Sequence, residues 1–285
     1  MMLPGQPSQT LLRTAIRRAQ HQMLDRPLIL HDPIVVDLVP EASEPHILAD
    51  FGGSEELLPA MFRALFAMRS RFAEDRLAQA AARGVRQYVM IGAGLDTFPW
   101  RQPGFARDMR IFAADHPASL VWTHRRLRER NVEHPSNLTH VPVDLEEQCL
   151  AEQLATCGFD LEAPSFCTLL GVSQYITGDA LDALLRFAAS LKPESELVLS
   201  FAPPDDELAG LDLDATTRSI ARTAELGEPW KSRPRARDLI DRLVQLGFSD
   251  VFHLSPEQAQ ARYFAGRDDQ LRAPRWEQLI AAIRK

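Results

Sequence analysis

The sequence predicts an α/β fold with a doubly wound, mostly parallel sheet, an antiparallel last strand and a helical cap in front. Between Tyr88 and Phe201, short β-branched or apolar runs alternate with longer amphipathic runs, the pattern of stacked βαβ units. The chain has 285 residues, 45% of them hydrophobic, which is enough apolar material for one large α/β domain or two small ones. We expect a single domain over residues 1–285.

Five short runs in this central region are expected to form the strands of the sheet. They cover 88–91, 110–114, 140–143, 166–170 and 197–201. The runs between them are expected to be helices over 119–130, 146–156 and 179–191. In the last helix, apolar residues recur on one face, as a helix packed on a sheet requires: Leu181, Leu184, Leu185 and Ala188.

The flanking regions complete the predicted domain. Residues 9–22 and 59–83 show helical periodicity. The polar, proline-containing stretch 203–234 is expected to be irregular. A helix over 235–246 and a strand over 248–254, which ends the sheet, are expected after it. The expected parts of the domain are a helical cap over 1–84, a cofactor-binding core over 85–202, a covering insertion over 203–234 and a completion of the sheet over 235–285.

Composition excludes several classes of function. Lys and Arg total 32 against 39 Asp and Glu, a formal net charge of −7, so a dedicated nucleic-acid binder is not expected. No stretch of about 20 apolar residues predicts a membrane span, and the first ten residues lack a signal-peptide pattern, so we expect a cytoplasmic protein. The three cysteines and eight histidines lack ligand spacing, and no metal site is expected.

A glycine-rich turn, Gly92-Ala93-Gly94, directly follows the first predicted strand and is expected to lead into a helix. Glycines at such a turn let the backbone approach a ligand closely. A dinucleotide site has a third small residue three places after Gly94, where this chain has Thr97, and the carboxylate of Asp96 would repel a phosphate. S-adenosylmethionine carries a sulfonium and an ammonium and no phosphate, so the turn favours it over NAD. A turn that merely starts a packed helix is the alternative.

Two further carboxylates follow predicted strands. Asp115 ends the second strand 21 residues after Gly94, close to the usual offset of an acid that binds ribose hydroxyls. Asp144 follows the third strand, where it would accept the adenine amino group while Leu145 packs on the ring. An N-cap of the helix after Asp144 is an equally good interpretation of that residue.

Several motifs along the whole chain resemble the leucine carboxyl methyltransferase family, and in particular its bacterial S-adenosylmethionine-dependent O-methyltransferases. The resemblance is carried by Arg69-Ser70-Arg71-Phe72, Gly92 to Thr97, Asp115-His116-Pro117, Val143-Asp144-Leu145, Gly171 to Tyr175, and Gly227-Glu228-Pro229-Trp230. The Gly92 to Thr97 motif and the Asp-His-Pro motif together are quite specific for this family, whereas each motif alone is not.

The resemblance implies a class I methyltransferase with a Rossmann-like sheet. It implies that Arg69 grips the cofactor's carboxylate, that the Gly92-Ala93-Gly94 turn and Asp96 shape the cofactor loop, and that Asp115, with His116 beside it, holds the ribose. Asp144 and Leu145 would bracket the adenine, and the N-terminal helices with the 203–234 insertion would cover the acceptor pocket.

One position departs from the family pattern. After the fourth strand the family usually has Glu-Gly-x-x-x-Tyr, and here Leu170 stands in place of the acid while Tyr175 is retained. The missing acid would lie near the sulfonium or the acceptor, so Leu170 bears on cofactor affinity or acceptor choice. The Tyr175 hydroxyl would orient cofactor or acceptor, with a core aromatic as the alternative.

Methyl transfer from a sulfonium depends mainly on alignment and exclusion of water, and a carboxylate acceptor needs no general base. A hydroxyl acceptor needs one, for which His116 and Glu228 are the candidates. The hypothesis is an O-methyltransferase acting on a small molecule, more at a carboxylate than at a hydroxyl. The alternatives are a cofactor-binding protein without transferase activity and an NAD-linked reductase. The sequence does not identify the acceptor or the oligomeric state.

Overall fold

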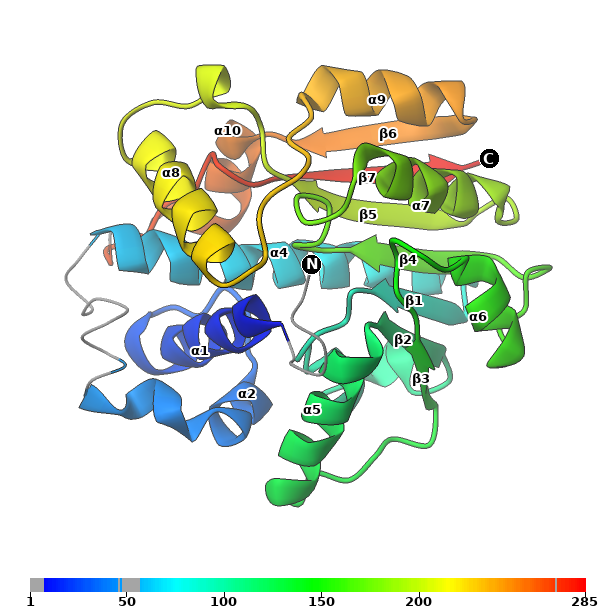
Figure 1. Ribbon diagram of the computed structural model, residues 1–285, viewed down its shortest axis with the longest axis horizontal. Helices are drawn as coiled ribbons and strands as arrows, with labels where there is room; N and C mark the ends of the chain where they lie inside the picture. Colours follow the sequence, from blue (N-terminus) through cyan, green and yellow to red (C-terminus); the bar gives the residue numbers. More distant parts are fainter. Residues whose placement is uncertain (1–7, 46, 48–56, 270) are drawn as a thin grey trace.

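A seven-stranded sheet forms the centre of the protein (Figure 1). The computed structural model describes residues 8–45, 47, 57–269 and 271–285. The strands lie in the order β3-β2-β1-β4-β5-β7-β6. Their bounds are β1 Gln87–Ile91, β2 Arg110–Asp115, β3 Leu138–Pro142, β4 Ser165–Leu169, β5 Glu196–Phe201, β6 Phe248–Leu254 and β7 Gln278–Arg284. The five strands predicted in the central region are therefore confirmed to within two residues at each end.

The sheet is mostly parallel with an antiparallel last strand, as predicted, but the antiparallel strand is a segment that sequence analysis did not identify. β7 pairs antiparallel with both β5 and β6, so β6 runs in the same direction as the first five strands. All five central residues of β7 are buried, because it lies between two neighbours under helices. Its sequence is therefore a short apolar run without the period-two alternation that marks a half-exposed strand.

Helices cover both faces of the sheet, which confirms the doubly wound arrangement. Val89 and Ile91 of β1 pack in one core cluster, with the helices α6 (Leu150–Thr156), α7 (Gly178–Ser190) and α9 (Ala236–Gln245). Tyr88 and Met90 point the opposite way, into a second cluster dominated by α4 (Leu57–Ala82). This alternation follows from the period of two along a strand. At the β3 edge lies α5 (Pro117–Glu129).

The helix expected after the glycine turn is not present. Turns and two short 3-10 helices, Phe98–Trp100 and Gly104–Ala106, join β1 to β2. The face that this missing helix would cover is filled by α4, which precedes β1 in the chain. The helix predicted from residue 146 also begins later, at Leu150, because residues 145–148 form a turn.

The insertion, expected to be irregular, contains the 16-residue helix α8 (Gly210–Glu225). Only four of its residues are buried: Asp212, Ala215, Thr216 and Thr223. None of these is a large apolar residue, and Leu211, Leu213 and Ile220 are too few to give a clear periodic pattern. Together with α1 (Gln9–Leu24) and the first half of α4, α8 forms the lobe on the left of Figure 1. Two further helices are α2 (Pro33–Leu38) and α10 (Pro256–Ala259), and α10 runs into a π-helical turn, Gln260–Phe264. A 3-10 turn, Pro40–Ser43, follows α2, and another, Asp205–Glu207, precedes α8.

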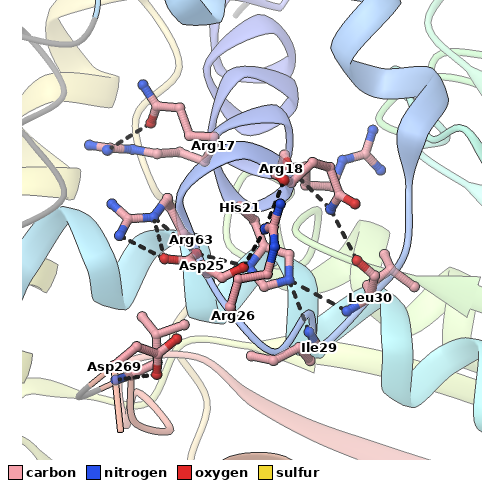
Figure 2. Close-up of polar contacts among 12 residues, drawn as sticks. Arg17, Arg18, His21, Asp25, Arg26, Ile29, Leu30, Arg63 and Asp269 are labelled. Atoms are coloured by element: carbon pink, nitrogen blue, oxygen red, sulfur yellow. Dashed lines mark hydrogen bonds and ion pairs between the residues drawn. The ribbon is translucent and has the colours of Figure 1, made fainter. Parts of the chain in front are cut away.

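A buried ionic network joins α1 to α4 (Figure 2). Arg63 of α4 donates from Nε and Nη2 to the carboxylate of Asp25 at 2.9–3.2 Å, and His21 Nδ1 lies 2.8 Å from the same carboxylate. His21 Nε2 accepts from the Ile29 backbone N–H at 3.0 Å, so the proton of the neutral ring sits on Nδ1. Burial acts to raise the pKa of Asp25, but the hydrogen bonds from His21 and Arg63 outweigh it and lower that pKa. The network fixes the helix that carries Arg17 and Arg18.

None of the helices in the described ranges is long and apolar enough to span a membrane. We predict no membrane span anywhere in the chain, and residues 1–7, 46, 48–56 and 270, to which this prediction also applies, lie outside the described residues.

Candidate functional site

A cavity of about 850 Å³ lies at the carboxyl ends of the central parallel strands. Its floor is made by the residues that follow β1, β2, β3 and β4. We use the term cover for its other walls, which are α1, the first half of α4, α8, the loop 227–231 and residues 276–277. This place, outside the carboxyl ends of the strands, is where open α/β sheets bind ligands, and the volume suits one or two small molecules.

The glycine turn is held tightly against β2 and the β4 loop. Gly92 and Ala93 both donate their backbone N–H to the Ala114 carbonyl, at 2.8 and 3.1 Å. Gly92 has φ +73°, and a Cβ there would overlap Cγ2 of Val172. Glycine is therefore required at position 92 for both conformation and space.

Asp115 binds the glycine turn from the end of β2. Its Oδ2 accepts from the Gly94 N–H at 2.5 Å, and its Oδ1 accepts from the His116 N–H at 2.7 Å. Burial raises the pKa of Asp115, with these two N–H bonds acting against the shift. The half-buried carboxylate also lines the cavity, where its remaining lone pairs are available to hydroxyl groups. Its role with ribose stays a prediction.

Asp144 and His116 face one another across the cavity floor. Oδ2 of Asp144 lies 3.9 Å from Nε2 of His116, and Oδ1 accepts from the Glu146 N–H at 3.0 Å. Asp144 thus closes a turn and does not cap α6, so the N-cap interpretation is wrong. His116 uses Nδ1 to accept from the Ala118 N–H at 3.2 Å, which caps α5. Leu145, partly buried, follows Asp144 along the cavity wall.

Asp96 also lies at the cavity, but a residue that sequence analysis did not name faces it. Arg18 of α1 places Nη1 3.8 Å from Asp96 Oδ1 and donates from Nη2 to the Leu95 carbonyl. Asp96 Oδ1 accepts from the Phe98 N–H at 2.9 Å. The carboxylate therefore holds α1 and the glycine turn together, and its electrostatic role toward the cofactor stays a prediction.

Arg69 of α4 lies against the chain that leaves β4. A Cβ on Gly171 would overlap its Nη1, so the missing side chain of Gly171 makes room for the guanidinium. Nη1 donates to Oε1 of Glu277 at 2.9 Å, and the two side chains are 11% and 7% exposed. Leu170, next to Gly171, is a half-buried apolar part of the same wall. The acidic side chain beside Arg69 is thus Glu277, and no motif in the sequence around Glu277 predicted this position.

Tyr175 and Trp230 meet edge to face on the wall nearest the insertion, with ring centroids 6.4 Å apart. Burial raises the pKa of Tyr175 to about 12, with Glu228 and Glu277 adding to the shift while the Trp230 side chain and Arg69 oppose it. The buried Nε1 of Trp230 lies beside the Tyr175 hydroxyl and has no hydrogen bond of good geometry among the described residues. Since an unpaired buried N–H is costly, this donor is available to a ligand. Trp100 lies elsewhere, packed between two core clusters.

Glu228, a predicted candidate base, joins the insertion to the start of α1. Its Oε2 accepts from the hydroxyls of Thr10 at 2.7 Å and Ser8 at 3.0 Å. A second bridge ties the insertion to the cavity floor, where Lys231 Nζ lies 2.7 Å from Glu146 Oε1. Both bridges fasten the insertion to other walls of the cavity.

The charges of the cavity wall are divided between floor and cover. The floor contributes five acidic side chains and no Lys or Arg among the described lining residues: Asp96, Asp115, Asp144, Glu146 and Glu147. The cover contributes two acidic side chains, Glu228 and Glu277, and seven basic ones: Arg13, Arg17, Arg18, Arg69, Arg218, Arg222 and Lys231.

The described residues fit S-adenosylmethionine. The acidic floor suits a cationic, phosphate-free molecule, and the overlap that a Cβ on Gly92 or Gly171 would cause shows a cradle shaped by backbone. Arg69 and Asp115 both line this cavity, and their roles with the carboxylate and the ribose of the cofactor stay predictions. In the described part of the chain, no group of three or more His, Cys, Asp or Glu side chains is arranged to hold a metal ion.

Comparison with known proteins gives matches over the whole chain. The profile of the family described as "Leucine carboxyl methyltransferase" matches residues 11–189. A Bacillus subtilis protein named "Putative S-adenosyl-L-methionine-dependent methyltransferase YktD" is 27% identical over the full length of both chains. A protein of Mycobacteroides abscessus with the same description is 31% identical over 81% of this chain and 74% of its own.

Two solved structures resemble the fold along almost their whole length. A protein from Thermobifida fusca, titled a "putative methyltransferase", has a TM-score of 0.59 at 17% identity and covers 99% of this chain and 96% of its own. A DUF574 family protein from Streptomyces avermitilis has a TM-score of 0.57 at 15% identity, covering 95% and 97%. Together with the strand order, these likenesses show the class I methyltransferase fold.

Proposed function

Because the chain belongs to the leucine carboxyl methyltransferase family and is an S-adenosylmethionine-dependent methyltransferase, we propose a specific acceptor for it. In this proposal, the protein methylates a carboxylate oxygen of a small-molecule acid. Family membership also removes the alternative of an NAD-linked reductase.

The division of charge in the cavity carries the proposal. A carboxylate acceptor is an anion, and seven of the nine charged side chains of the cover are basic. The acidic floor would instead repel an anion and attract the cationic cofactor. A cavity with one acidic side and one basic side therefore suits a cationic methyl donor beside an anionic acceptor better than it suits a neutral alcohol.

The hydrogen bonds of the candidate bases also favour a carboxylate. His116 uses Nδ1 to cap α5, and Glu228 accepts from the hydroxyls of Ser8, which precedes α1, and Thr10. Neither group needs to remove a proton if the acceptor is already ionised, so their structural bonds remain intact during the reaction.

The residues of the chain would then act by binding and alignment. The bound cofactor supplies the electrophilic methyl group. The Trp230 indole N–H and the Tyr175 hydroxyl would donate to the acceptor carboxylate. The bridges of Glu228 and Lys231 would keep the insertion over the cavity and exclude water.

Matched pairs of carboxylic acids and alcohols test the proposal. The purified protein with S-adenosylmethionine is expected to convert an acid such as decanoic acid into its methyl ester, detected by mass spectrometry, and to leave decanol unmethylated. Methyl ether formation from the alcohol at an equal or higher rate would overturn the proposal.

A pair of arginine variants distinguishes a positive charge at the cavity from a positive charge elsewhere on the protein. Arg218 lies on α8 at the cavity, and Arg237 on α9 is 90% exposed outside it. We expect Arg218→Gln to raise KM for the acid about three- to tenfold, since a partly exposed ion pair contributes about 1 kcal/mol, and Arg237→Gln to leave KM unchanged.

A further inference from the structure

We propose that the acceptor is an amphipathic acid with a long, unbranched apolar chain, and that this chain binds along one face of α4 while its carboxylate lies at the Tyr175 end of the cavity. The inference rests on the proposed function and names the class of acid. The surface concerned, here called the apolar stripe, consists of Leu58, Phe62 and Phe66.

The apolar stripe follows the period of the helix. Residues four apart on a helix lie on one face, and Leu58, Phe62 and Phe66 are spaced in this way. All three line the cavity and are only partly buried. Their neighbours on the other faces of α4, such as Met61 and Met68, are almost completely buried in the core, at 0% and 2% exposure. The stripe is therefore the face of α4 that is left for a ligand.

The stripe leads away from the site of methyl transfer. Arg69, one turn beyond Phe66, lies against Gly171 at the end of β4, beside the glycine cradle. From Arg69 back to Leu58 is 11 residues, or about 16 Å along the helix axis, which would accommodate roughly ten to twelve extended chain carbons. A short acid would leave most of this length in contact with water.

Aromatic rings of the apolar stripe contact one another and Trp276. The Phe62 ring lies 5.1 Å from the Trp276 ring and 6.3 Å from the Phe66 ring, measured between centroids. Guanidinium groups stand over both phenyl rings, Arg17 at 5.6 Å from Phe62 and Arg69 at 5.0 Å from Phe66. These contacts hold the rings in place, so an extended chain meets a preformed surface.

The same walls explain why the molecule is an acid with an apolar chain and not a hydrocarbon or a polar dicarboxylate. Basic side chains on α1 and α8 also line the cavity, which attracts an anion to it, while Leu58, Phe62 and Phe66 offer apolar contact to the chain of the ligand. Burying a methylene stabilises a complex enough to improve binding about three- to fourfold. A second charge in the middle of the ligand chain would lose hydration against Leu58, Phe62 and Phe66, where a methylene group gains apolar contact.

Chain length is the direct test. We would measure kcat/KM for straight-chain monocarboxylic acids from four to sixteen carbons, with S-adenosylmethionine saturating. We expect a rise of about three- to fourfold per methylene up to ten to twelve carbons, followed by a plateau or a fall. Equal values at all lengths, or a preference for dicarboxylates or for peptides with a free terminal carboxylate, would overturn the inference.

Two variants test whether the apolar chain of the acid binds along α4. Leu58→Trp fills the far end of the stripe, and we expect it to lower the ratio of kcat/KM for the twelve-carbon acid to that for the six-carbon acid by about tenfold. Leu161→Trp makes the same change at a 39% exposed residue outside the cavity and is expected to leave the ratio as it is. An unchanged ratio in Leu58→Trp would place the chain elsewhere.

Measuring ligand binding in the absence of methyl transfer tests the apolar stripe separately from the proposed function. If no acid of any length is methylated, calorimetry with decanoate and the demethylated cofactor still reports on the stripe. Decanoate binding that weakens at least tenfold in Phe62→Ala, with cofactor affinity unchanged, would support the stripe while the proposed reaction failed. Decanoate binding unaffected by Phe62→Ala would refute the stripe itself.

Discussion

Arg69 and Glu277 form a hydrogen-bonded ion pair of 2.9 Å between residues 208 positions apart in the chain. One comes from the middle of α4 and the other from the residue before β7. The pair joins the last strand of the sheet to the wall of the cavity that faces the end of β4. Because the pair is nearly buried, either side chain without the other would be a poorly solvated charge.

We expect Glu277→Gln to weaken binding of the demethylated cofactor about tenfold. The amide still accepts one hydrogen bond, but without the charge it holds the Arg69 guanidinium less firmly. The free energy of unfolding should fall by about 1 to 3 kcal/mol, since a charge-assisted bond in a buried site is replaced by a neutral one. Titration calorimetry and urea unfolding measure the two effects.

Leu170→Glu offers a rescue of that variant. Leu170 adjoins Gly171, against which Arg69 rests, so a carboxylate at position 170 is within reach of the guanidinium. The double variant Leu170→Glu with Glu277→Gln is expected to recover cofactor affinity to within about threefold of the original. Recovery of stability without recovery of affinity would mean that Glu277 is structural and does not position Arg69 for the cofactor.

Asp115→Ala should weaken cofactor binding by about 1 to 3 kcal/mol, the free energy of hydrogen bonds to a charged group. The variant loses the acceptor of the Gly94 N–H as well as the predicted ribose contact. Asp115→Asn serves as the control, because the amide oxygen still accepts from Gly94. Calorimetry that gives the same affinity for all three proteins would remove Asp115 from the cofactor site.

Gly92→Ala should destabilise the fold by about 1 to 3 kcal/mol and abolish cofactor binding at micromolar concentrations. The added Cβ overlaps Val172 Cγ2, and the φ of +73° is strained for alanine. In the background of Val172→Ala, which removes the overlapping methyl group, about half of the lost stability should return, the remainder being backbone strain. Thermal unfolding of the four proteins gives the coupling between the two sites.

A cluster of three histidines predicts how stability depends on pH. Burial, together with the neighbouring His124 and His134, lowers the pKa of His140 to about 4. The rings lie at centroid distances of 4.2 and 5.2 Å from that of His140, and Arg128 adds its positive charge beside His124. In the unfolded chain His140 titrates near pH 6.5, so the unfolded state takes up a proton first as the pH falls.

The stability linked to His140 is therefore complete above pH 6.5 and is lost as the pH falls toward 4. We expect the Tm of the protein to decline across this range and the decline to be smaller in His140→Gln, measured by calorimetry in buffers of equal ionic strength. His253→Gln, at a histidine outside the cluster, is the matched comparison. Identical slopes for all three proteins would contradict the assignment.

Local patterns in the sequence determined the core of the fold and the floor of the site. The first five strands, the glycine turn and the strand-end acids Asp115 and Asp144 were all predicted, because each depends on residues close together in the chain. A buried strand needs a short apolar run, a tight turn over a ligand needs glycine, and the carboxyl ends of parallel strands meet at one edge.

Only the tertiary structure decided the other walls of the cavity. β7 has no alternating pattern because both of its faces are buried, and α8 has too few apolar residues to show its period. Glu277, Arg18 and the apolar stripe gained their roles from partners that are distant in sequence. Which side chains meet across such separations depends on how whole helices pack on the sheet, and short-range periodicity carries no record of that packing.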